Sequence, residues 1–523
     1  MFNSEDVITR YVLERQARTS PDLEFITFED GSSWTYKKAL QVAYSAANSL
    51  REAGIRRSDR VAVMFANGPE FLRAWWGAAI LGARLIPIHT GYRGQLLERM
   101  LKLSKPHAVV GDLNLMSVFD EISDSSLVPK CRLTDSDLHS VNTDTPMLDE
   151  PIETWEPAFY LMTSGTTGAS KLSTCTYRTL YVGARANVAP LRGREDCLLV
   201  DIPLFHGGGL RLVIGSLAIG ARMAMRSRPH LSQYWESAKE MQVTMSCLVS
   251  SMVDIVLAQT SRPAERDHNI RVMSTTPLPH DPRGFMERFG IAQLNVLYGS
   301  TEVPAPLGGV PGDELVRGYC GRPRPGYHCR IVDENDIERP HGQAGELIIC
   351  HDEPWVIASY ENDPAANEKA WRNGWFHTGD MMRRDAVGRY FYVDRVKDSL
   401  RRRGENISSA EVEAEVLEFP GVKEAACVAY RSEKHTDDEV KVWIVPQEGW
   451  EIDFAELLKV CVRRLPYFMV PRFFELIDDL PRTHNQKIRK LELRERGNSD
   501  FTWDREAHGF TVSREGLSEK IDK

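Results

Sequence analysis

The chain has 523 residues, of which 42% are hydrophobic and 27% charged, a composition that predicts a sizeable core and excludes disordered, collagen-like and coiled-coil proteins. Lys and Arg number 65 against 74 Asp and Glu, and this net charge of −9 leaves no overall positive field to attract nucleic acid or an anionic membrane. The longest apolar stretches are shorter than the roughly 20 residues that a spanning helix needs, so we expect no membrane span.

Strand and helix patterns alternate through the first part of the chain. Residues 33–56 have the pattern of a short strand followed by a helix with apolar residues at helical spacing. A buried-strand run begins at Arg60, a helix follows over 69–81, and another strand comes next. Similar strands recur at 198–202 and 243–249. This order predicts an α/β fold, with a large N-terminal domain of mixed, largely parallel sheets flanked by helices.

The pattern changes after Gly345, where short strands separated by turn residues are typical of antiparallel hairpins. Further on come a Glu-rich helix, two strands, a second helix and a last strand, which together predict a compact α+β domain. We therefore place an N-terminal domain at 1–396, a small C-terminal domain at 397–495 and a polar extension at 496–523.

The most informative segment is a loop rich in hydroxyls and glycines that directly follows the apolar run 159–162. Its glycines allow backbone N–H groups to face an anion, its hydroxyls add donors and its lysine adds a charge, so it predicts a polyphosphate-binding loop. Only two residues separate its glycines, so it is not a Walker loop; a polar surface loop is the alternative. The expected phosphate-binding residues are Thr163, Ser164, Gly165, Thr166, Thr167, Gly168 and Lys171.

Two further segments combine groups that suit a nucleotide. Tyr298-Gly-Ser-Thr-Glu302 offers a ring on which adenine could stack, a Thr301 hydroxyl for a phosphate and a carboxylate for Mg²⁺. Trp375-Phe-His-Thr-Gly-Asp380 ends in an aspartate suited to bonding both ribose hydroxyls. The alternatives are a tight turn with a surface acid for the first segment and a hairpin corner for the second.

In their order along the chain, these segments resemble the ANL superfamily of adenylate-forming enzymes, and within it the AMP-forming acyl-CoA synthetases. The likeness covers the chain from about Glu14 to Leu493, and it is greatest to a crotonobetaine/carnitine-CoA ligase-like branch. It implies the ANL fold, in which the small C-terminal domain is mobile. The motifs that carry the resemblance are 163–171, 203–206, 298–302, 376–380, 394–398, 403–407 and 480–487.

The resemblance implies an ATP- and Mg²⁺-dependent ligase that joins a small carboxylic acid to CoA. In its first step a carboxylate oxygen attacks the α-phosphorus of ATP to give an acyl-adenylate and pyrophosphate. In its second step the CoA thiol attacks the acyl carbon and AMP leaves. Because the first step joins two anions, positioned cations and hydrogen-bond donors should dominate its catalysis.

Site residues follow from the match to the family motifs. The implied catalytic residues are Lys487, Thr301, Glu302 and His206, with Glu302 also the Mg²⁺ ligand. Lys487 would bridge the substrate carboxylate and the α-phosphate, and His206 would line the wall between the acyl pocket and the pantetheine tunnel. The remaining contacts are Thr275, Thr276, Pro277, Tyr298 and Gly299 around adenine, Asp380 and Arg395 at the ribose, Lys397 at the hinge between two catalytic poses, and Gly404 beside the pantetheine.

The chain departs from the family pattern in three places. Ser170 and Leu172 flank the loop lysine where proline and glycine are usual, and Gln486 replaces the glycine before the catalytic lysine. Thr275 and Thr276 stand where smaller residues are common. These departures and the general family resemblance leave two alternatives open. One is an adenylating enzyme that loads a carrier protein, and the other is a nucleotide-binding homologue that has lost turnover.

Cysteine usage bears on the cellular compartment. The nine cysteines are scattered, with no Cys-x-x-Cys spacing, which argues against a disulfide framework and a zinc site and favours a reducing, cytoplasmic location. The N-terminal residues lack the pattern of an export signal. Beyond its acid and CoA we expect no nucleic acid partner, and we expect a homodimer as the general state of soluble enzymes.

Overall fold

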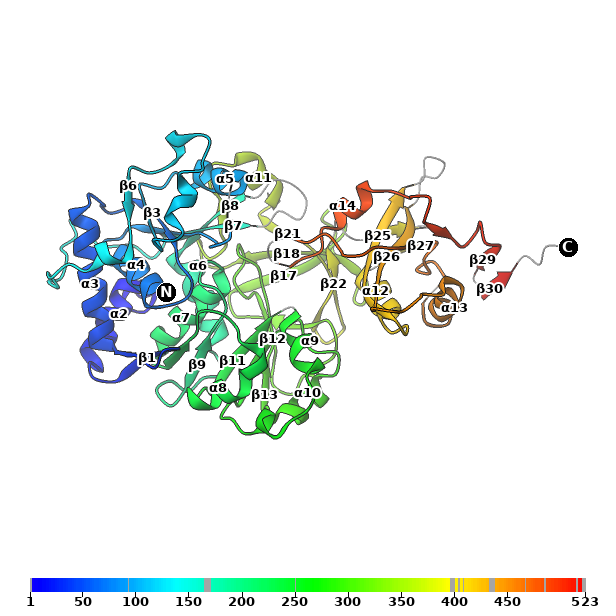
Figure 1. The fold of residues 1–523 in the computed structure, drawn as a ribbon, viewed down its shortest axis with the longest axis horizontal. Helices are drawn as coiled ribbons and strands as arrows, with labels where there is room; N and C mark the ends of the chain where they lie inside the picture. The colour runs from blue at the N-terminus through cyan, green and yellow to red at the C-terminus, as the bar shows by residue number, and fades with distance from the viewer. Residues whose placement is uncertain are drawn as a thin grey trace. The chain divides into compact units, whose positions relative to one another are not determined.

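The computed structural model describes residues 2–92, 94–163, 171–249, 251–395, 400–402, 405–407, 409–431, 438–465, 467–483, 486–513 and 516–519. The chain divides into two compact units (Figure 1). The first contains the described residues of 1–163, 171–329 and 349–376, and the second those of 330–348 and 377–519. Within the described ranges, no helix combines the length and the apolar character needed to cross a bilayer.

The first unit contains a seven-stranded sheet that is parallel except at one edge, where β2 pairs antiparallel with β1. The strands in the middle of this sheet are short and almost fully buried, as expected for a parallel sheet covered on both faces. In sheet order they are β13 (Gln293–Asn295), β12 (Val272–Thr276), β11 (Met245–Val249), β9 (Cys197–Val200), β10 (Arg222–Met225), β1 (Glu24–Phe28) and β2 (Ser33–Thr35).

A second seven-stranded sheet of the same unit is mixed. Four of its strands are parallel to one another, and β7 pairs parallel with β4, one of these four. β7 also forms an antiparallel hairpin with β8, and the short β19 pairs antiparallel with β8. In order they are β19 (Ser359–Tyr360), β8 (Lys171–Thr176), β7 (Pro157–Thr163), β4 (Arg84–Pro87), β3 (Arg60–Met64), β5 (Ala108–Gly111) and β6 (Cys131–Leu133).

Helices pack between these two sheets and on their outer faces. Along β3, Val61 and Val63 join one large core that also holds residues of the first sheet, whereas Ala62 and Met64 face a smaller core with α5 (Gly94–Ser104). The large core includes side chains of α2 (Thr9–Thr19), α3 (Tyr36–Glu52), α4 (Pro69–Ile80), α6 (Tyr177–Asn187) and α7 (Gly207–Ile219). Figure 1 shows α6 and α7 between the two sets of strands.

The first unit also contains short antiparallel strands and surface helices. β14 pairs with β15, and β15 with β16. The bounds of these elements are α1 (Ser4–Val7), β14 (Leu297–Tyr298), β15 (Leu307–Gly308), β16 (Tyr319–Pro323), α8 (Tyr234–Glu240), α9 (Ser251–Ala258), α10 (Pro282–Phe289), α11 (Pro364–Ala370) and β20 (Trp371–Arg372).

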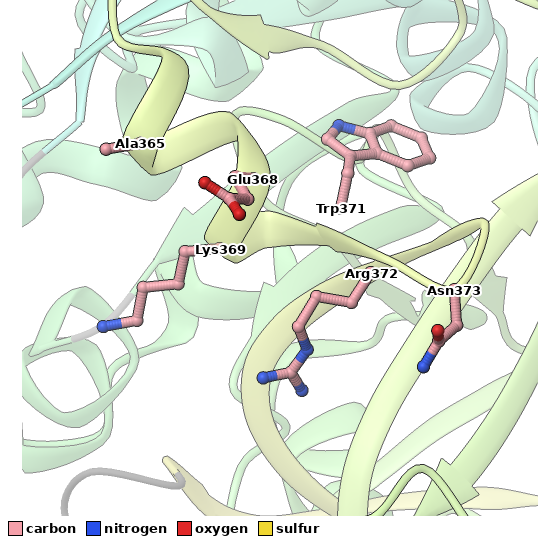
Figure 2. A pocket seen from close by; sticks show the side chains of 6 residues that line it. All are labelled: Ala365, Glu368, Lys369, Trp371, Arg372 and Asn373. Atoms are coloured by element: carbon pink, nitrogen blue, oxygen red, sulfur yellow. The ribbon is translucent and has the colours of Figure 1, made fainter.

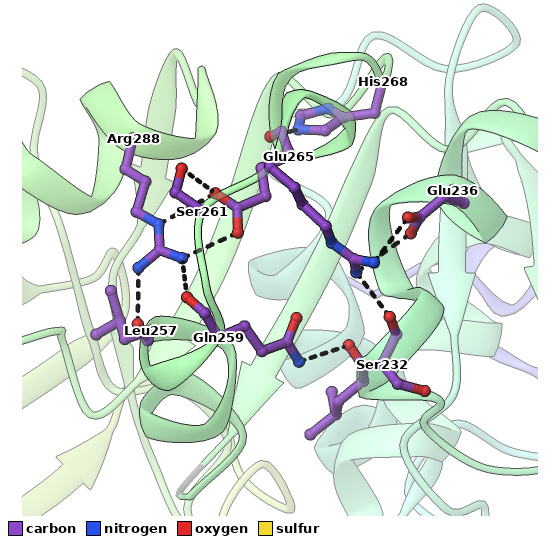
Figure 3. A network of polar contacts seen from close by, with 10 residues as sticks. Ser232, Glu236, Leu257, Gln259, Ser261, Glu265, His268 and Arg288 are labelled. Atoms are coloured by element: carbon purple, nitrogen blue, oxygen red, sulfur yellow. Dashed lines mark hydrogen bonds and ion pairs between the residues drawn. The ribbon is translucent and has the colours of Figure 1, made fainter.

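A polar network holds the C-terminal end of α9 (Figure 3). The Arg288 guanidinium donates to the carbonyl oxygens of Leu257, at 2.6 Å, and Gln259, at 2.7 Å. It also pairs with the buried Glu265 carboxylate, Nη2 to Oε1, at 2.9 Å. Burial alone would raise the pKa of Glu265, but hydrogen bonds from Arg288 and Ser261 outweigh it and lower that pKa. The network therefore fixes the helices that follow β11 and β12.

We expect Arg288→Met to lower the free energy of unfolding by about 2–3 kcal/mol, because it leaves the Glu265 carboxylate buried without its cation. The matched change Arg262→Met breaks an exposed ion pair with Glu236, in which Nη1 lies 3.0 Å from Oε1. It should lower the free energy of unfolding by less than about 1 kcal/mol. Because folding lowers the pKa of Glu265, the carboxylate stabilises the fold fully at pH values above its ordinary pKa of 4.5. This contribution to the free energy of unfolding is lost as the pH falls through the lower pKa of the folded state. Denaturant unfolding at neutral and acid pH measures both effects; equal losses for the two variants at neutral pH would contradict the expectation.

The second unit is built on a four-stranded sheet with the order β25-β26-β27-β28. One face packs against α12 and α13 in a core that includes Val412, Val442 and Leu457. The other face holds Trp443 together with Leu480 and other side chains of the segment that leads into α14. The elements are β25 (Val422–Arg431), β26 (Asp438–Pro446), β27 (Phe473–Leu476), β28 (Trp503–Asp504), α12 (Ser409–Leu417), α13 (Phe454–Arg464), α14 (Lys490–Glu495), β23 (Leu400–Arg402), β24 (Glu405–Ile407), β29 (Phe510–Ser513) and β30 (Gly516–Glu519).

Three longer strands run through residues that are divided between the two units. They are β17 (Tyr327–Val332), β18 (Ala344–His351) and β21 (Trp375–Arg384). Within the second unit β21 pairs antiparallel with β22 (Tyr390–Arg395). The predicted boundary residue Lys397 lies outside the described residues, so the domain limits 1–396, 397–495 and 496–523 stay a prediction.

The described residues of the predicted polar extension, 496–513 and 516–519, are part of the second unit. Its strand β28 pairs antiparallel with β27, and Arg472 Nη2 bonds Asp504 Oδ2 at 3.0 Å. The Lys441 ammonium is buried against Glu475, at 2.6 Å, and Thr502 of the segment donates to the same carboxylate. The sequence did not predict that this segment is folded, because a strand of two residues shows no periodicity.

Candidate active site

The Glu302 carboxylate lies at the centre of a buried polar cluster in the first unit. It is 9% exposed, and both of its oxygens accept a hydrogen bond from a hydroxyl. Tyr360 Oη donates to Oε1 at 2.9 Å, and Ser300 Oγ donates to Oε2 at 3.0 Å. Each oxygen keeps a lone pair for another partner. The arrangement presents a fixed, charged oxygen donor of the kind that Mg²⁺ prefers.

Tyr360 comes from a distant part of the chain and contacts both Glu302 and Lys171, the lysine of the predicted phosphate loop. Its ring lies under the Lys171 ammonium, with Nζ 4.5 Å from the ring centroid. Lys171 opens β8 and pairs in register with Thr163, the last residue of β7; Thr163 Oγ1 donates to the Lys171 carbonyl at 3.3 Å. The hairpin thus places both ends of the predicted phosphate loop. Its central residues Ser164, Gly165, Thr166, Thr167 and Gly168 lie outside the described residues, as does Ser170.

Arg211 binds the backbone of the Tyr298–Glu302 motif through hydrogen bonds to two of its carbonyls. Its guanidinium donates to the carbonyl of Ser300 at 3.1 Å and to that of Thr301 at 3.0 Å. Burial lowers the pKa of Arg211, and the nearby Cys175, Tyr327 and Glu302 offset this effect only in part. Burial also raises the pKa of the Cys175 thiol, which contacts the Thr301 carbonyl, to about 12. Sequence reasoning missed Arg211, although a charged residue inside an apolar helix signals that a polar partner is needed.

Gly299 leaves no room for a side chain in this turn. A Cβ built there would lie 2.6 Å from the Ala305 nitrogen and 2.9 Å from the Val303 carbonyl oxygen, both backbone atoms. The turn therefore closes on itself at this position, and that closure sets the offset between Tyr298 and Glu302.

Gly299→Ala should cost about 1–3 kcal/mol of stability and lower catalytic activity, because the backbone from 299 to 305 must shift to admit the methyl group. Gly208→Ala is the matched control, since its Cβ would meet only Ile202 Cγ2, at an ordinary 3.7 Å, and alanine favours the helix. Thermal unfolding and a turnover assay measure the two effects. Unchanged stability and activity in Gly299→Ala would show that the turn tolerates expansion.

The predicted adenine wall begins with Thr275 and Thr276 at the C-terminal end of β12. Thr275 is buried, and its hydroxyl has no hydrogen-bond partner among the described residues, whereas Thr276 and Pro277 are exposed and joined by a cis peptide bond. Asn295 donates to the neighbouring Ser274 hydroxyl at 3.0 Å. A buried hydroxyl without a partner is costly, so this position favours a ligand with a polar group.

His206 directly precedes α7 within a small aromatic cluster. Its ring lies 4.9 Å from that of Phe205 and 6.5 Å from that of His89, between ring centroids, and His89 also stacks on Tyr92. The ring is half-buried, and its side chain does not cap α7. These aromatic contacts suit the predicted role of His206 in the wall between the acyl pocket and the pantetheine tunnel.

The predicted ribose ligand Asp380 lies in β21 of the second unit, where it pairs in register with Arg395 of β22. It is buried, and its N–H donates to Thr378 Oγ1 at 3.1 Å. The same strand is anchored by Glu346, which bonds His377 Nδ1 at 2.9 Å and the Gly379 N–H at 2.9 Å. Asp380 therefore has a rigid support.

Lys487 stands on an exposed tight turn of the second unit. The Thr483 N–H donates to the Lys487 carbonyl at 2.8 Å, and the Lys487 N–H donates to Thr483 Oγ1 at 3.2 Å. Gln486 adopts φ of +61°, a left-handed conformation that favours glycine, and its carbonyl accepts from Arg482 Nη1 at 3.0 Å. Arg482 also pairs with Glu424. The turn keeps a glycine-like backbone despite the glutamine.

Several predictions fall on positions that the structure does not describe. Lys397 and Gly404 lie outside the described residues, and so does the side chain of Arg395. Among the described residues, no cluster of three or more His, Cys, Asp or Glu is arranged to hold a metal. An open surface pocket of about 540 Å³ contains none of the predicted site residues (Figure 2); it is lined by Ala365, Glu368, Lys369, Trp371, Arg372 and Asn373.

The two large sheets flanked by helices give the first unit an α/β fold, and the Lys171–Tyr360–Glu302 contacts lie beside the β7–β8 hairpin of one of them. Residues 13–360 match the family model described as AMP-binding enzyme, and residues 411–487 match the AMP-binding enzyme C-terminal domain. The chain belongs to the AMP-binding enzyme family. The predicted ANL superfamily membership and fold class are confirmed by these matches and by the solved structures below.

Relatives with assigned activities cover nearly the whole chain. The crotonobetaine/carnitine–CoA ligase of Salmonella enteritidis PT4 is 28% identical over 482 residues, covering 88% of this chain and 93% of that protein. ATP-bound MatB from Rhodopseudomonas palustris has a similar fold, with a TM-score of 0.83, 23% identity, and coverage of 93% of this chain and 98% of that one. O-succinylbenzoate coenzyme A synthetase (MenE) from Bacillus subtilis, solved with ATP and magnesium ion, gives a TM-score of 0.82 at 24% identity, covering 92% and 98%.

Proposed function

We propose that the protein is an ATP-dependent, AMP-forming carboxylic acid:CoA ligase that works through an acyl-adenylate. The observation that carries the proposal is the contact series from Lys171 through Tyr360 to Glu302, which brings a cation and a carboxylate together beside the end of the β7–β8 hairpin. This is the pair of groups needed to bind a triphosphate and its metal ion. Family membership and the CoA ligase relatives support the same reaction.

The residues present fit a magnesium ion. Mg²⁺ usually keeps several waters and is bound by one or two carboxylates together with substrate phosphates. Glu302 supplies one buried carboxylate whose oxygens are already oriented by two hydroxyls. A bound Mg²⁺ would neutralise phosphate charge at this carboxylate. Arg211 holds the surrounding backbone, so Glu302 need not reorganise when the ligand arrives.

We assign the first unit the task of holding the nucleotide. Thr163, Lys171 and the loop between them bind the β- and γ-phosphates as an anion-binding loop. Thr301 hydrogen-bonds the α-phosphate, and Glu302 holds the metal ion. The wall at Thr275, Thr276, Pro277, Tyr298 and Gly299 receives the adenine.

We assign the second unit the ribose and the reacting groups. Asp380, with Arg395, bonds the ribose hydroxyls. The Lys487 ammonium neutralises the substrate carboxylate and the α-phosphoryl oxygens during the first step, where two anions must meet. The hinge role of Lys397, the pantetheine contact of Gly404 and the wall role of His206 complete the assignment for the second step. Cytoplasmic location and a homodimer stay predictions.

Pyrophosphate release from ATP and Mg²⁺ across a panel of carboxylic acids, with and without CoA, tests the proposal. Crotonobetaine and carnitine are placed first because they are the acids in the relatives' names. We expect pyrophosphate with one class of acid in both conditions, and a thioester only when CoA is present. Pyrophosphate without any thioester would point to carrier-protein loading, and ATP binding without release to a homologue that has lost turnover.

A further inference from the structure

Tyr360 contacts both charged groups that the proposed function uses at the triphosphate. Its hydroxyl donates to Glu302 Oε1 at 2.9 Å, and its ring supports the Lys171 ammonium at 4.5 Å. The two contacts use different parts of the side chain, the oxygen in one case and the π-face in the other. A single residue therefore contacts both the carboxylate that we propose for the metal ion and the ammonium that we propose for the phosphates.

The backbone of Tyr360 is held from both sides. On one side β19 pairs with β8, with Tyr360 opposite Ser173. On the other side the Asn367 side chain of α11 replaces a neighbouring strand: its Oδ1 accepts from the Tyr360 N–H at 2.8 Å, and its Nδ2 donates to the Tyr360 carbonyl at 2.7 Å. These hydrogen bonds on both sides of the backbone fix the positions of the Tyr360 ring and hydroxyl.

The flanking residues attach the same segment to the site. The Ala358 N–H donates to the Glu302 carbonyl at 2.8 Å, so the segment braces Glu302 through its backbone as well as its side chain. Glu361 bonds Thr174 Oγ1 at 3.0 Å and pairs with Arg60, which ties the segment to β8 and β3. Tyr360 is thus attached to the rigid sheet that carries Lys171.

We propose that Tyr360 is a positioning residue that orients Glu302 for Mg²⁺ through its hydroxyl and holds Lys171 for the phosphates through its ring. This inference rests on the proposed function. The hydroxyl donates a charge-assisted hydrogen bond to one carboxylate oxygen, which fixes the direction of the remaining lone pairs. The ring attracts the ammonium through its π-face and brings no counter-charge, so this contact leaves the positive charge of Lys171 available to an incoming phosphate.

The two roles are separable by substitution. Tyr360→Phe removes the hydroxyl and keeps the ring, whereas Tyr360→Leu removes both contacts. Tyr181→Phe removes a hydroxyl from a half-buried tyrosine of α6 that packs on Phe2, outside the site, and is the matched control. Because Tyr360→Phe is nearly isosteric, it should keep the fold, which thermal unfolding verifies.

The test is equilibrium binding of ATP by titration calorimetry at a series of Mg²⁺ concentrations, with no acid present. The measured quantity is the Mg²⁺ concentration at which half of the Mg²⁺-dependent gain in ATP affinity is reached. For Tyr360→Phe we expect this midpoint to rise about threefold to tenfold, while the ATP affinity in the absence of Mg²⁺ stays unchanged. For Tyr360→Leu we expect ATP affinity to fall also in the absence of Mg²⁺. An unchanged Mg²⁺ midpoint in Tyr360→Phe, or an equal change in Tyr181→Phe, would overturn the proposal.

This measurement separates the inference from the proposed function. Since no acid is present, it reports on the binding of ATP and Mg²⁺ alone. The ligase function would be contradicted if the wild-type protein bound ATP with Mg²⁺ but released no pyrophosphate with any acid of the panel. The shift of the Mg²⁺ midpoint in Tyr360→Phe would still decide the role of Tyr360.

Discussion

Lys487→Ala is expected to slow acyl-adenylate formation by about 10²–10³-fold while ATP binding stays close to that of the wild type. The reason is electrostatic: the first step brings a carboxylate to a charged α-phosphate, and the ammonium offsets the repulsion between them. The turn from Thr483 to Lys487 is closed by its own hydrogen bonds, so removing the exposed side chain should leave the second unit folded. Pyrophosphate exchange and ATP titration measure the two properties.

Two comparisons sharpen the Lys487 prediction. Lys459→Ala removes the same charge from α13 of the second unit, where the ammonium pairs with Glu456 at 2.8 Å, and should leave the rate unchanged. Acyl-adenylate supplied ready-made to Lys487→Ala should still give thioester, because the second step begins after the two anions have been joined. Normal adenylation by Lys487→Ala would remove Lys487 from the mechanism.

Glu302→Gln is expected to lower kcat/KM by about 100-fold at ordinary Mg²⁺ concentrations, with partial recovery as Mg²⁺ is raised. The amide keeps the size of the side chain but loses the charge that attracts a hard cation. It also removes the negative charge near the buried Arg211 guanidinium. Pyrophosphate release as a function of Mg²⁺ concentration is the measurement.

Glu368→Gln provides the control for Glu302→Gln. Glu368 lies on the exposed surface of α11, in the pocket of Figure 2, and the change makes the same difference in net charge. Its Mg²⁺ dependence should match the wild type. If Glu302→Gln also kept the wild-type Mg²⁺ dependence, the metal ion would have to be held by other groups.

The sequence was sufficient to predict the fold class, and it also supplied the segments that we propose for the site. Buried-strand runs separated by amphipathic helices predicted mixed, largely parallel sheets flanked by helices, and the run at 159–162 lies in β7, as expected. The Tyr298–Glu302 motif was also recognisable, because its glycine and hydroxyls mark a turn next to a carboxylate. Local patterns of this kind depend on a few neighbouring residues, which a sequence displays directly.

The contacts that organise the site could not be predicted in the same way. Tyr360 lies 58 positions after Glu302, in a strand of two residues that is too short for any periodicity. Its place depends on pairing with β8 and on Asn367, neither of which has a local signal. Arg211 could be recognised as a charge in an apolar helix, but its partners, the carbonyls of Ser300 and Thr301, appear only once α7 has packed.

Oxygen transfer is the most direct test of the central claim that the protein activates a carboxylic acid by adenylation. An active acid labelled with ¹⁸O in its carboxylate is incubated with ATP, Mg²⁺ and CoA, and the mass of the AMP is measured. Because a carboxylate oxygen attacks the α-phosphorus and the acyl C–O bond is cleaved by the thiol, we predict AMP that carries one ¹⁸O atom for each thioester formed. Thioester accompanied by unlabelled AMP, or by ADP and phosphate, would contradict the account.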